Sequence, residues 1–173
     1  MCDNGTWVVP FESTAGSTRR IHPIYHPSVP EKPSASSRPE PSSPVVSEQM
    51  RRMPVKDSRG EVLLRTELHV LGLRFRKHLR GLPGTPDVAF TRARIAVFLD
   101  GCFWHGCPDH GVLPKANRAW WKAKLDGNKQ RDRRKDEALR ELGWLPVHVW
   151  EHEDPREAAA RIRQLWRTRI PPN

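Results

Sequence analysis

The first regular pattern of apolar and polar positions in the chain begins at Ser58. The stretch SRGE matches a capping box, with Ser58 as the N-cap and Glu61 at the third helical position. Three leucines then fall on one helical face before Gly72 ends the pattern: Leu64, Leu68 and Leu71. These residues predict an amphipathic helix that starts just after Ser58 and packs its leucine face against a core.

Four later segments show the short apolar or alternating patterns of β-strands. LRFRKH, residues 73–78, alternates like a half-buried strand, and DVAF at 87–90 and RIAVFL at 94–99 follow as short apolar runs. LPVHVW, residues 145–150, is a further apolar run of strand length. We therefore expect three strands in succession and a fourth near the end of the chain.

Two further helices are predicted around that last strand. A long polar helix runs from Asn117 to Leu142, and Gly143 closes it. Asp154 followed by Pro155 starts the final helix, because Pro is favoured at the first helical position, and its apolar stripe consists of Ile162, Leu165 and Trp166. The order helix, three strands, helix, strand, helix predicts an α/β fold in which helices pack against one sheet.

Composition separates the first 47 residues from the rest of the chain. Residues 10–47 are rich in Pro and Ser with few apolar side chains, so we expect residues 1–47 to be a disordered tail and residues 48–173 to form one domain. No window has the roughly 18 apolar residues of a membrane span, and the start lacks a signal-peptide pattern. A cytosolic protein is the expectation.

The formal net charge of +10 predicts an acidic partner. Residues 1–47 hold four basic and four acidic side chains, so the whole excess lies in residues 48–173. A basic excess within one compact domain favours nucleic acid as the partner, although a run of charges is more often only a solvated face.

The stretch FLDGCFWHGCPDH gathers ligands for a transition metal. Cys102, Cys107 and His110 have the spacing C-x4-C-x2-H, and zinc takes four ligands of these types. His152 reaches this loop if the two preceding strands are neighbours, and His105 is a rival ligand. The alternative is a pair of free buried thiols, since three cysteines in a chain with no sign of secretion do not suggest disulfides.

Acidic residues at strand ends indicate a second, catalytic metal site. Asp87, in the turn LPGTPD, stands at the start of one strand, and the next strand runs into Asp100 and then His105. Carboxylates beside a histidine suit Mg²⁺-assisted phosphodiester hydrolysis, in which the metal holds the phosphate and a base deprotonates water. A turn aspartate is more often only a turn residue, so Asp87 gains weight only from its neighbours.

Aromatic and basic side chains nearby indicate contacts with DNA. Phe103 and Trp104 lie in a short polar loop that cannot easily bury both, so they either stack on or wedge between bases or belong to an ordinary core. RDRRKD, with Arg131 and Arg133, adds phosphate-contacting charge or a solvated helix surface. One face of the same helix joins an aromatic, an amide and a carboxylate: Trp121, Leu125, Asn128 and Asp132.

These residues together resemble the very short patch repair (Vsr) endonucleases, which nick DNA beside thymine–guanine mismatches. The resemblance covers residues 47–153 and rests on SEQMRRM, LPGTPD, VFLDGCFWHGCP, LPKANRAWW, NKQRDRRKDEALRELGW and VWEHE, in the family's order. It implies a restriction-endonuclease-like fold, a central mixed sheet flanked by helices, with a structural zinc site. It also implies a Mg²⁺-dependent endonuclease of the bacterial cytoplasm and nucleoid, a monomer with mismatch-repair partners of the MutL type.

The resemblance assigns roles to individual residues. Asp87 matches the family's Mg²⁺ ligand, joined by the backbone carbonyl of Leu99, and His105 matches the histidine that acts on the attacking water. Glu61 and Asp132 match supporting acidic positions. Glu61 is therefore claimed both as a helix cap and as an active-site residue.

The family's aromatic wedge matches Phe103 and Trp104, with Trp121 as their partner on the long helix. Two positions depart from the family pattern. Leu99 stands where Thr is frequent, and Asp100 stands where some relatives carry His, which adds a metal ligand or changes how the phosphate is held. The structural zinc position matches Cys102, Cys107, His110 and His152.

The expected function is to nick one strand of duplex DNA on the 5′ side of the thymine in a T·G mismatch, which initiates very short patch repair of deaminated 5-methylcytosine. One alternative is a restriction-type endonuclease on the same fold, which cuts intact sites and does not need the aromatic wedge. The other is a non-catalytic, zinc-stabilised DNA-binding module whose carboxylates are structural. Cleavage in the presence of Mg²⁺ separates this last class from the other two.

Overall fold

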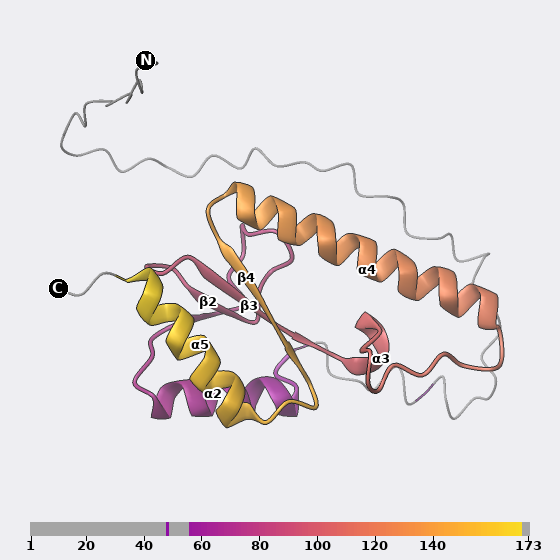
Figure 1. Ribbon diagram of the computed structural model, residues 1–173, viewed down its shortest axis with the longest axis horizontal. Helices are drawn as coiled ribbons and strands as arrows, with labels where there is room; N and C mark the ends of the chain where they lie inside the picture. Colours follow the sequence, from indigo (N-terminus) through magenta and orange to yellow (C-terminus); the bar gives the residue numbers. More distant parts are fainter. Residues whose placement is uncertain (1–47, 49–55, 171–173) are drawn as a thin grey trace, which may run out of the picture. The chain divides into compact units, whose positions relative to one another are not determined.

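The computed structural model describes residue 48 and residues 56–170. The predicted tail, residues 1–47, lies outside these residues. Along the described part the elements are α2 (Arg59–Val70), β1 (Arg76–Lys77), β2 (Val88–Phe90), β3 (Ile95–Asp100), α3 (Cys102–His105), α4 (Arg118–Glu141), β4 (Leu145–Trp150) and α5 (Pro155–Arg169) (Figure 1). The predicted order of helices and strands is confirmed, with the short α3 as an addition.

The four strands form one mixed sheet in the order β1-β2-β3-β4. β1 to β3 are joined antiparallel, whereas β3 and β4 pair in parallel with Ile95 opposite Leu145 and Asp100 opposite Trp150. Helices α2 and α5 pack on one face of this sheet, and α4 lies along the other side of β4 (Figure 1). This mixed sheet flanked by helices fits the expected restriction-endonuclease-like fold.

The predicted start of α2 is confirmed atom by atom. The Glu61 backbone N–H donates to Ser58 Oγ at 3.3 Å, and the Glu61 carboxylate accepts from the Ser58 backbone N–H at 3.3 Å. The helix ends at Val70 with Leu71 as its C-cap, and Gly72 follows in the left-handed conformation at φ 74°. The cap fixes where α2 begins, and so which of its side chains face the sheet.

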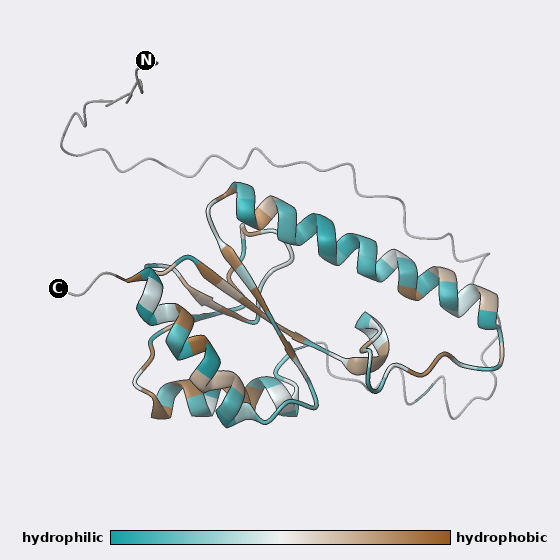
Figure 2. Cartoon of the chain, in the orientation of Figure 1, coloured by the Kyte–Doolittle hydropathy of each residue, from teal (hydrophilic) through white to brown (hydrophobic). Residues whose placement is uncertain are grey.

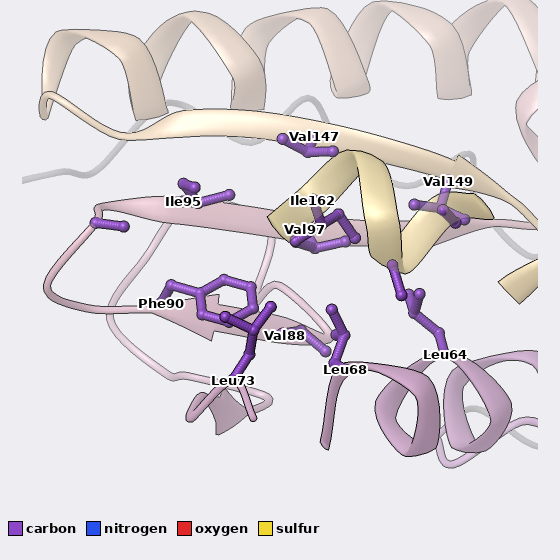
Figure 3. Close-up of a cluster of buried hydrophobic side chains, with 13 residues drawn as sticks. Leu64, Leu68, Leu73, Val88, Phe90, Ile95, Val97, Val147, Val149 and Ile162 are labelled. Carbon is purple, nitrogen blue, oxygen red and sulfur yellow. The ribbon is translucent and has the colours of Figure 1, made fainter. Parts of the chain in front are cut away.

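The core lies between the sheet and the pair α2 and α5 (Figure 3). Alternate residues of β3 and β4 point into it, because side chains of a strand alternate between its two faces. Leu64 and Leu68 of α2 and Ile162 of α5 meet these strands from the other side, and all three are at most 2% exposed. The inward strand residues are Val88, Phe90, Ile95, Val97, Val147 and Val149.

Two sequence predictions need correction. The strand expected at 73–78 covers only Arg76–Lys77, because Leu73 and Phe75 pack on the core from a loop and His78 takes a positive φ of 45°, which ends extended pairing. The segment after β3 was expected to be a loop but contains α3, a four-residue helix closed by Gly106 in the left-handed region at φ 63°. Glycine adopts this conformation without the strain that a side chain brings.

Helix α4 follows its predicted limits closely, and α5 begins at the predicted Pro155. Helix α4 has 24 residues and is hydrophilic over most of its length (Figure 2), as its sequence indicated. Asp154 caps α5 by accepting hydrogen bonds from the backbone N–H groups of Arg156 and Glu157 at 2.8 and 3.2 Å. Among the described residues, no helix combines the length and apolar character needed to cross a membrane.

Candidate active site and metal cluster

The candidate site gathers at the edge of the sheet where the parallel strands β3 and β4 both end. Their register places Asp100 beside Trp150, so α3, which follows β3, and His152, which follows β4, leave the sheet at the same edge (Figure 1). The condition on which His152 was expected to reach the loop, that these two strands are neighbours, is met. Ligands separated by about 50 residues in the sequence therefore meet at this edge.

Asp87 stands at the entry to β2, next to the end of β3. Its Oδ2 accepts a hydrogen bond from the backbone N–H of Leu99 at 2.8 Å, so the two predicted Mg²⁺-binding residues lie side by side. Burial raises the pKa of the Asp87 carboxyl, and the charges of Glu61 and Asp100 raise it further against the opposing hydrogen bond from Leu99. A bound cation would reverse this shift, because it favours the charged carboxylate.

His105, the last residue of α3, points at α4. Its Nδ1 lies 2.7 Å from Asp132 Oδ2, and Lys135 Nζ lies 3.0 Å from the other Asp132 oxygen. Burial lowers the pKa of His105, but the hydrogen bond to Asp132 and the charges of Asp100 and Asp132 outweigh it, so the net pKa is raised. Burial raises the pKa of Asp132, and the hydrogen bonds from His105 and Lys135 overcome this and hold it at about 2.

This pairing fixes the chemistry available to the imidazole ring. An ionised Asp132 can only accept hydrogen bonds, so Nδ1 of His105 carries the hydrogen. In the neutral ring the lone pair is then on Nε2, which is free to take a proton from water. The arrangement of a histidine oriented by a carboxylate is the one that general-base catalysis requires.

Asp100 lies behind His105 and is 6% exposed. One of its oxygens is 3.7 Å from Nδ1 of His105, and the other is 2.6 Å from Nδ1 of His148 on β4. The sequence analysis named Asp100 but did not single out His148, because LPVHVW has the pattern of an ordinary strand. The only signal was a titratable side chain within that strand, on the face opposite the apolar core.

Both carboxylate oxygens of Glu61 accept hydrogen bonds from residues close to it in the sequence. Oε1 accepts from the Ser58 backbone, and Oε2 accepts from the Asp57 backbone at 3.1 Å and from the Arg65 guanidinium at 3.3 Å. Its role as a cap is therefore confirmed, whereas its catalytic role stays a prediction. The Cβ that an alanine would add at Gly60 would lie 2.7 Å from a Leu99 methyl carbon, so this turn of α2 sits directly against the end of β3.

A second histidine missed from the sequence, His78, lies between these acidic groups. Its Nε2 is 3.7 Å from carboxylate oxygens of Asp57 and Glu61, and its Nδ1 is 3.8 Å from Asp87. The Arg65 guanidinium already pairs with both Asp57 and Glu61, so a side chain of the protein offsets part of their negative charge. His78 belongs to the wall of the site beside Asp87.

The four residues predicted to bind zinc lie in one cluster, with their candidate ligand atoms all within 4.8 Å of one another: Cys102, Cys107, His110 and His152. The sulfur of Cys102 is 3.0 Å from Nδ1 of His152, and that of Cys107 is 3.9 Å from the same atom. Tetrahedral zinc separates sulfur and nitrogen ligands by about 3.5 Å, which follows from bond lengths near 2.3 and 2.0 Å. The set therefore fits zinc, whereas the rival ligand His105 is held by Asp132.

The thiol chemistry of the cluster agrees with this fit. Burial raises the pKa of Cys102 to about 11, and the neighbouring Cys107 and Glu151 add to the shift. The Cys102 thiol is thus neutral unless a cation draws off its proton, as zinc does when it binds thiolates. The backbone N–H of His110 also donates to the sulfur of Cys107 at 3.4 Å, which orients that ligand.

The predicted wedge residues form one half-buried aromatic cluster. Phe103 and Trp104 of α3 lie 5.2 and 6.1 Å from Trp121 of α4, measured between ring centroids, and 5.0 Å from each other. Trp120, which the sequence analysis did not single out, stands edge-on to Trp121 at 4.8 Å. The adjacent pair WW in the sequence was a signal for it.

The face of α4 that was predicted to carry functional groups does face α3. Trp121 contacts the wedge, the Asn128 side chain donates to the Trp104 carbonyl at 2.9 Å, and Asp132 holds His105. Asn128 also accepts a hydrogen bond from Arg131, while Arg133 is exposed on α4. In the isolated chain Asn128 therefore anchors the backbone at Trp104, and its contact with DNA stays a prediction, like those of Arg131 and Arg133.

Comparison with known proteins gives one consistent answer. A family model described as DNA mismatch endonuclease Vsr matches residues 44–109, which include Asp87 and His105. The type II nicking enzyme V.NaeI of Lentzea aerocolonigenes is 44% identical over 110 residues, which are 61% of this chain and 66% of that protein.

Two further relatives are matched over more of their own length. The type II nicking enzyme V.XorIIP of Xanthomonas oryzae pv. oryzae is 41% identical over 122 residues, 67% of this chain and 88% of that protein. The DNA mismatch endonuclease Vsr of Escherichia coli is 38% identical over 108 residues, 61% of this chain and 68% of that protein. With a matching family model and relatives aligned over most of their length, the chain belongs to the Vsr family of DNA endonucleases.

Proposed function

We propose that this endonuclease nicks one strand of duplex DNA on the 5′ side of the thymine in a T·G mismatch, and so initiates very short patch repair of deaminated 5-methylcytosine. The observation that carries the proposal is the pairing of His105 with Asp132 at 2.7 Å beside an aromatic cluster on the same short helix. The candidate base and the candidate wedge thus share one short helix. The E. coli relative, by its name, is a DNA mismatch endonuclease.

Asp87 and the backbone carbonyl of Leu99 are the residues that would hold Mg²⁺, which supplies charge stabilisation at the scissile phosphate. Asp87 fits this task because its carboxyl is half-buried among other acidic groups and has a raised pKa without a cation. His105 takes the proton of the attacking water through Nε2. Asp132 keeps the ring in the tautomer that leaves Nε2 free and stabilises the charge that forms on it.

Zinc is the proposed structural metal of the loop that carries α3. Cys102 begins α3 and Cys107 follows it, so bonds from one ion to both residues and to His152 would tie both ends of the helix to the end of β4. The short helix has no side-chain N-cap of its own and only four residues. Such a helix is not stable by itself, so its orientation depends on these external anchors.

Selectivity is assigned to the aromatic cluster. Inserting aromatic side chains between base pairs costs a few kcal/mol of stacking, and it costs less where a mismatch has already weakened the stack. Phe103 and Trp104 are only partly buried, so they present apolar surface near His105. Arg131 and Arg133 of α4 are proposed to follow the phosphate backbone.

Replacing Trp104 by alanine is expected to reduce the preference for T·G over matched duplex roughly tenfold or more, because base stacking on an aromatic ring is worth about 1–3 kcal/mol. The nicking step on bound DNA should change much less than the preference. Trp104→Phe, which keeps a ring, should retain most of the discrimination. Binding titrations of both duplexes at one fixed salt concentration measure the effect, and full discrimination by Trp104→Ala would refute the wedge.

The second candidate function is strand nicking directed by an intact sequence, without a mismatch. The observation that favours it is that several relatives are named as type II nicking enzymes, a name that mentions no mismatch. A non-catalytic DNA-binding module is the third class.

The monomeric state and the partners of the MutL type stay predictions. The assignment of residues 48–173 as one domain is also a prediction.

One experiment separates these functions. Matched and T·G-mismatched duplexes, labelled on each strand in turn, are incubated with the enzyme with and without Mg²⁺, and the products are sized. The proposal requires a nick 5′ of the mismatched thymine that depends on Mg²⁺. Equal cutting of the matched duplex would indicate the sequence-directed enzyme, and binding without any cut would indicate the non-catalytic module.

A further inference from the structure

A continuous run of alternating acidic and imidazole side chains links His105 to the middle of β4. It starts at Asp136 of α4, whose Oδ1 lies 3.0 Å from Nε2 of His148. His148 Nδ1 lies 2.6 Å from Asp100 Oδ2, and Asp100 Oδ1 lies 3.7 Å from Nδ1 of His105. His148 and Asp136 lie outside residues 44–109, which the family model matches.

The hydrogen-bond partners of the two ring nitrogens indicate the charge of His148. Each of its ring nitrogens lies within hydrogen-bond distance of a carboxylate, and an ionised carboxylate can only accept. Both ring nitrogens must then carry a hydrogen, which makes the ring an imidazolium cation. The hydrogen bond to Asp100 raises the pKa of His148, burial opposes it, and the bond to Asp136 supports it, with a resulting pKa of about 9.

The other neighbours of His148 do not compete with Asp100 for the Nδ1 hydrogen of its ring. Phe98 of β3 stacks on the ring at 5.5 Å, and Arg161 of α5 donates to the His148 backbone carbonyl rather than to the ring. Arg140 of α4 pairs with the other oxygen of Asp136 at 3.1 Å, so Asp136 is shared between two cations. Within residues 56–170, the only other basic side chain in an ion pair with Asp100 is His105, at the longer distance of 3.7 Å, and Asp100 is almost fully buried.

Asp100 needs this partner because it stands among like charges. It faces His105 next to Asp132, and its charge raises the pKa of Asp87. A buried carboxylate that loses its hydrogen-bond partner is free to turn away from its neighbours. The Asp100 oxygen would then no longer be kept 3.7 Å from Nδ1 of His105, and Asp132 alone would orient the ring.

We propose that His148 is a positioning residue for the nicking reaction: its 2.6 Å contact with one oxygen of Asp100 keeps the other oxygen turned toward His105, so that Asp100 supplements the hydrogen bond by which Asp132 orients the base. Asp136 supports His148 from the other side. The inference rests on the proposed function, because it assumes that His105 activates the water. It assigns to Asp100 a role through His105 instead of a role as a metal ligand.

The kinetic test compares His148→Leu, which removes both donors, with His148→Gln, which keeps one. Single-turnover nicking of the T·G duplex at saturating enzyme should fall roughly 10- to 100-fold in His148→Leu, the range for residues that orient an active-site group, and less in His148→Gln. The dissociation constant for the duplex and the thermal midpoint of His148→Gln should stay near those of the wild type. Arg140→Ala, which breaks the other ion pair of Asp136, is the matched control and should nick within about twofold of wild type.

The double variant tests whether His148 acts through Asp100. In the Asp100→Asn background, His148→Gln should cause little further loss, because residues that act as one unit are not additive. Losses that multiply, or a His148→Leu enzyme that nicks at the wild-type rate, would overturn the proposal. A variant that loses binding and nicking in equal measure would also contradict it.

NMR of the histidine rings tests the proposed contacts of His148 without relying on the nicking reaction. In protein labelled with ¹⁵N histidine, the wild type should show a His148 ring with both nitrogens protonated at pH 8. The hydrogen-bonded Nδ1 proton of His105 should shift in His148→Leu but not in Arg140→Ala. A neutral His148 ring, or an unchanged His105 signal, overturns the inference even if T·G nicking is observed, whereas failure of the wild type to nick any duplex defeats the proposed function alone.

Discussion

Replacement of His105 by alanine is expected to lower the single-turnover nicking rate roughly 10²- to 10⁴-fold, the usual contribution of a general base, while the mismatched duplex is still bound. The expectation follows from the 2.7 Å contact between His105 Nδ1 and Asp132, which leaves Nε2 as the only nitrogen able to take a proton. The neutral ring is the active form and its pKa is raised, so the wild-type rate should increase as pH rises through that raised pKa.

Asp87→Asn is the companion variant for the metal side of the reaction. It replaces one carboxylate oxygen by an NH₂ group of similar size. The substitution therefore removes the negative charge and leaves the packing unchanged. The nicking step should again be abolished or severely reduced with binding retained, because the candidate Mg²⁺ ligand has been removed. Both variants are assayed by single-turnover product formation and by binding titrations at one salt concentration.

His69→Ala is the matched histidine control for this pair. His69 lies in the last turn of α2, is exposed and contacts Phe75. It should nick at a rate close to that of the wild type. An unchanged rate in His105→Ala would show that another group activates the water, and the assignment of the base would be wrong.

The second large effect is expected at the zinc cluster. Cys107→Ala should yield protein with less than one zinc per chain and a clearly lower thermal midpoint, in addition to reduced nicking. Zinc binding in small structural sites is worth about 10–16 kcal/mol at neutral pH, so the loss of one of four ligands removes a large part of what holds α3 against β4. Cys107 is 3% exposed, and its sulfur lies 3.9 Å from Nδ1 of both His110 and His152.

Metal analysis and thermal unfolding with and without a strong chelator measure this effect. The chelator should lower the midpoint of the wild type toward that of Cys107→Ala and should leave the variant almost unchanged. Cys2→Ala, which alters the chain's remaining cysteine, is the matched control and should keep both zinc and midpoint. Purified wild-type protein without zinc, or a midpoint that the chelator does not change, would contradict the structural zinc.

The sequence by itself determined the elements whose causes are local. The capping box at Ser58, the polar helix ended by Gly143 and the apolar runs of β2, β3 and β4 all depend on residues a few positions apart. Periodicity and caps act over that range, which is why these elements form where the sequence predicts them. The face of α4 that carries Asn128 and Asp132 was predicted for the same reason, since helix geometry alone aligns it.

Which distant side chains meet depends on how the strands pair in the folded protein. The contact of His148 with Asp100 spans 48 positions and that of His152 with Cys102 spans 50, and both depend on the parallel register of β3 and β4. Long-range register is set by the packing of the whole sheet, which no local pattern encodes.

The same reason explains the two corrections to the predicted elements. β1 is reduced to two residues because the segment before it packs its apolar side chains on the core from a loop. Helix α3 forms where its ends are anchored from outside, through the Cys102 N–H to Glu151 and the positive φ of Gly106. A four-residue helix has too little propensity to be read from its own residues, so it exists because its tertiary surroundings supply the missing contacts.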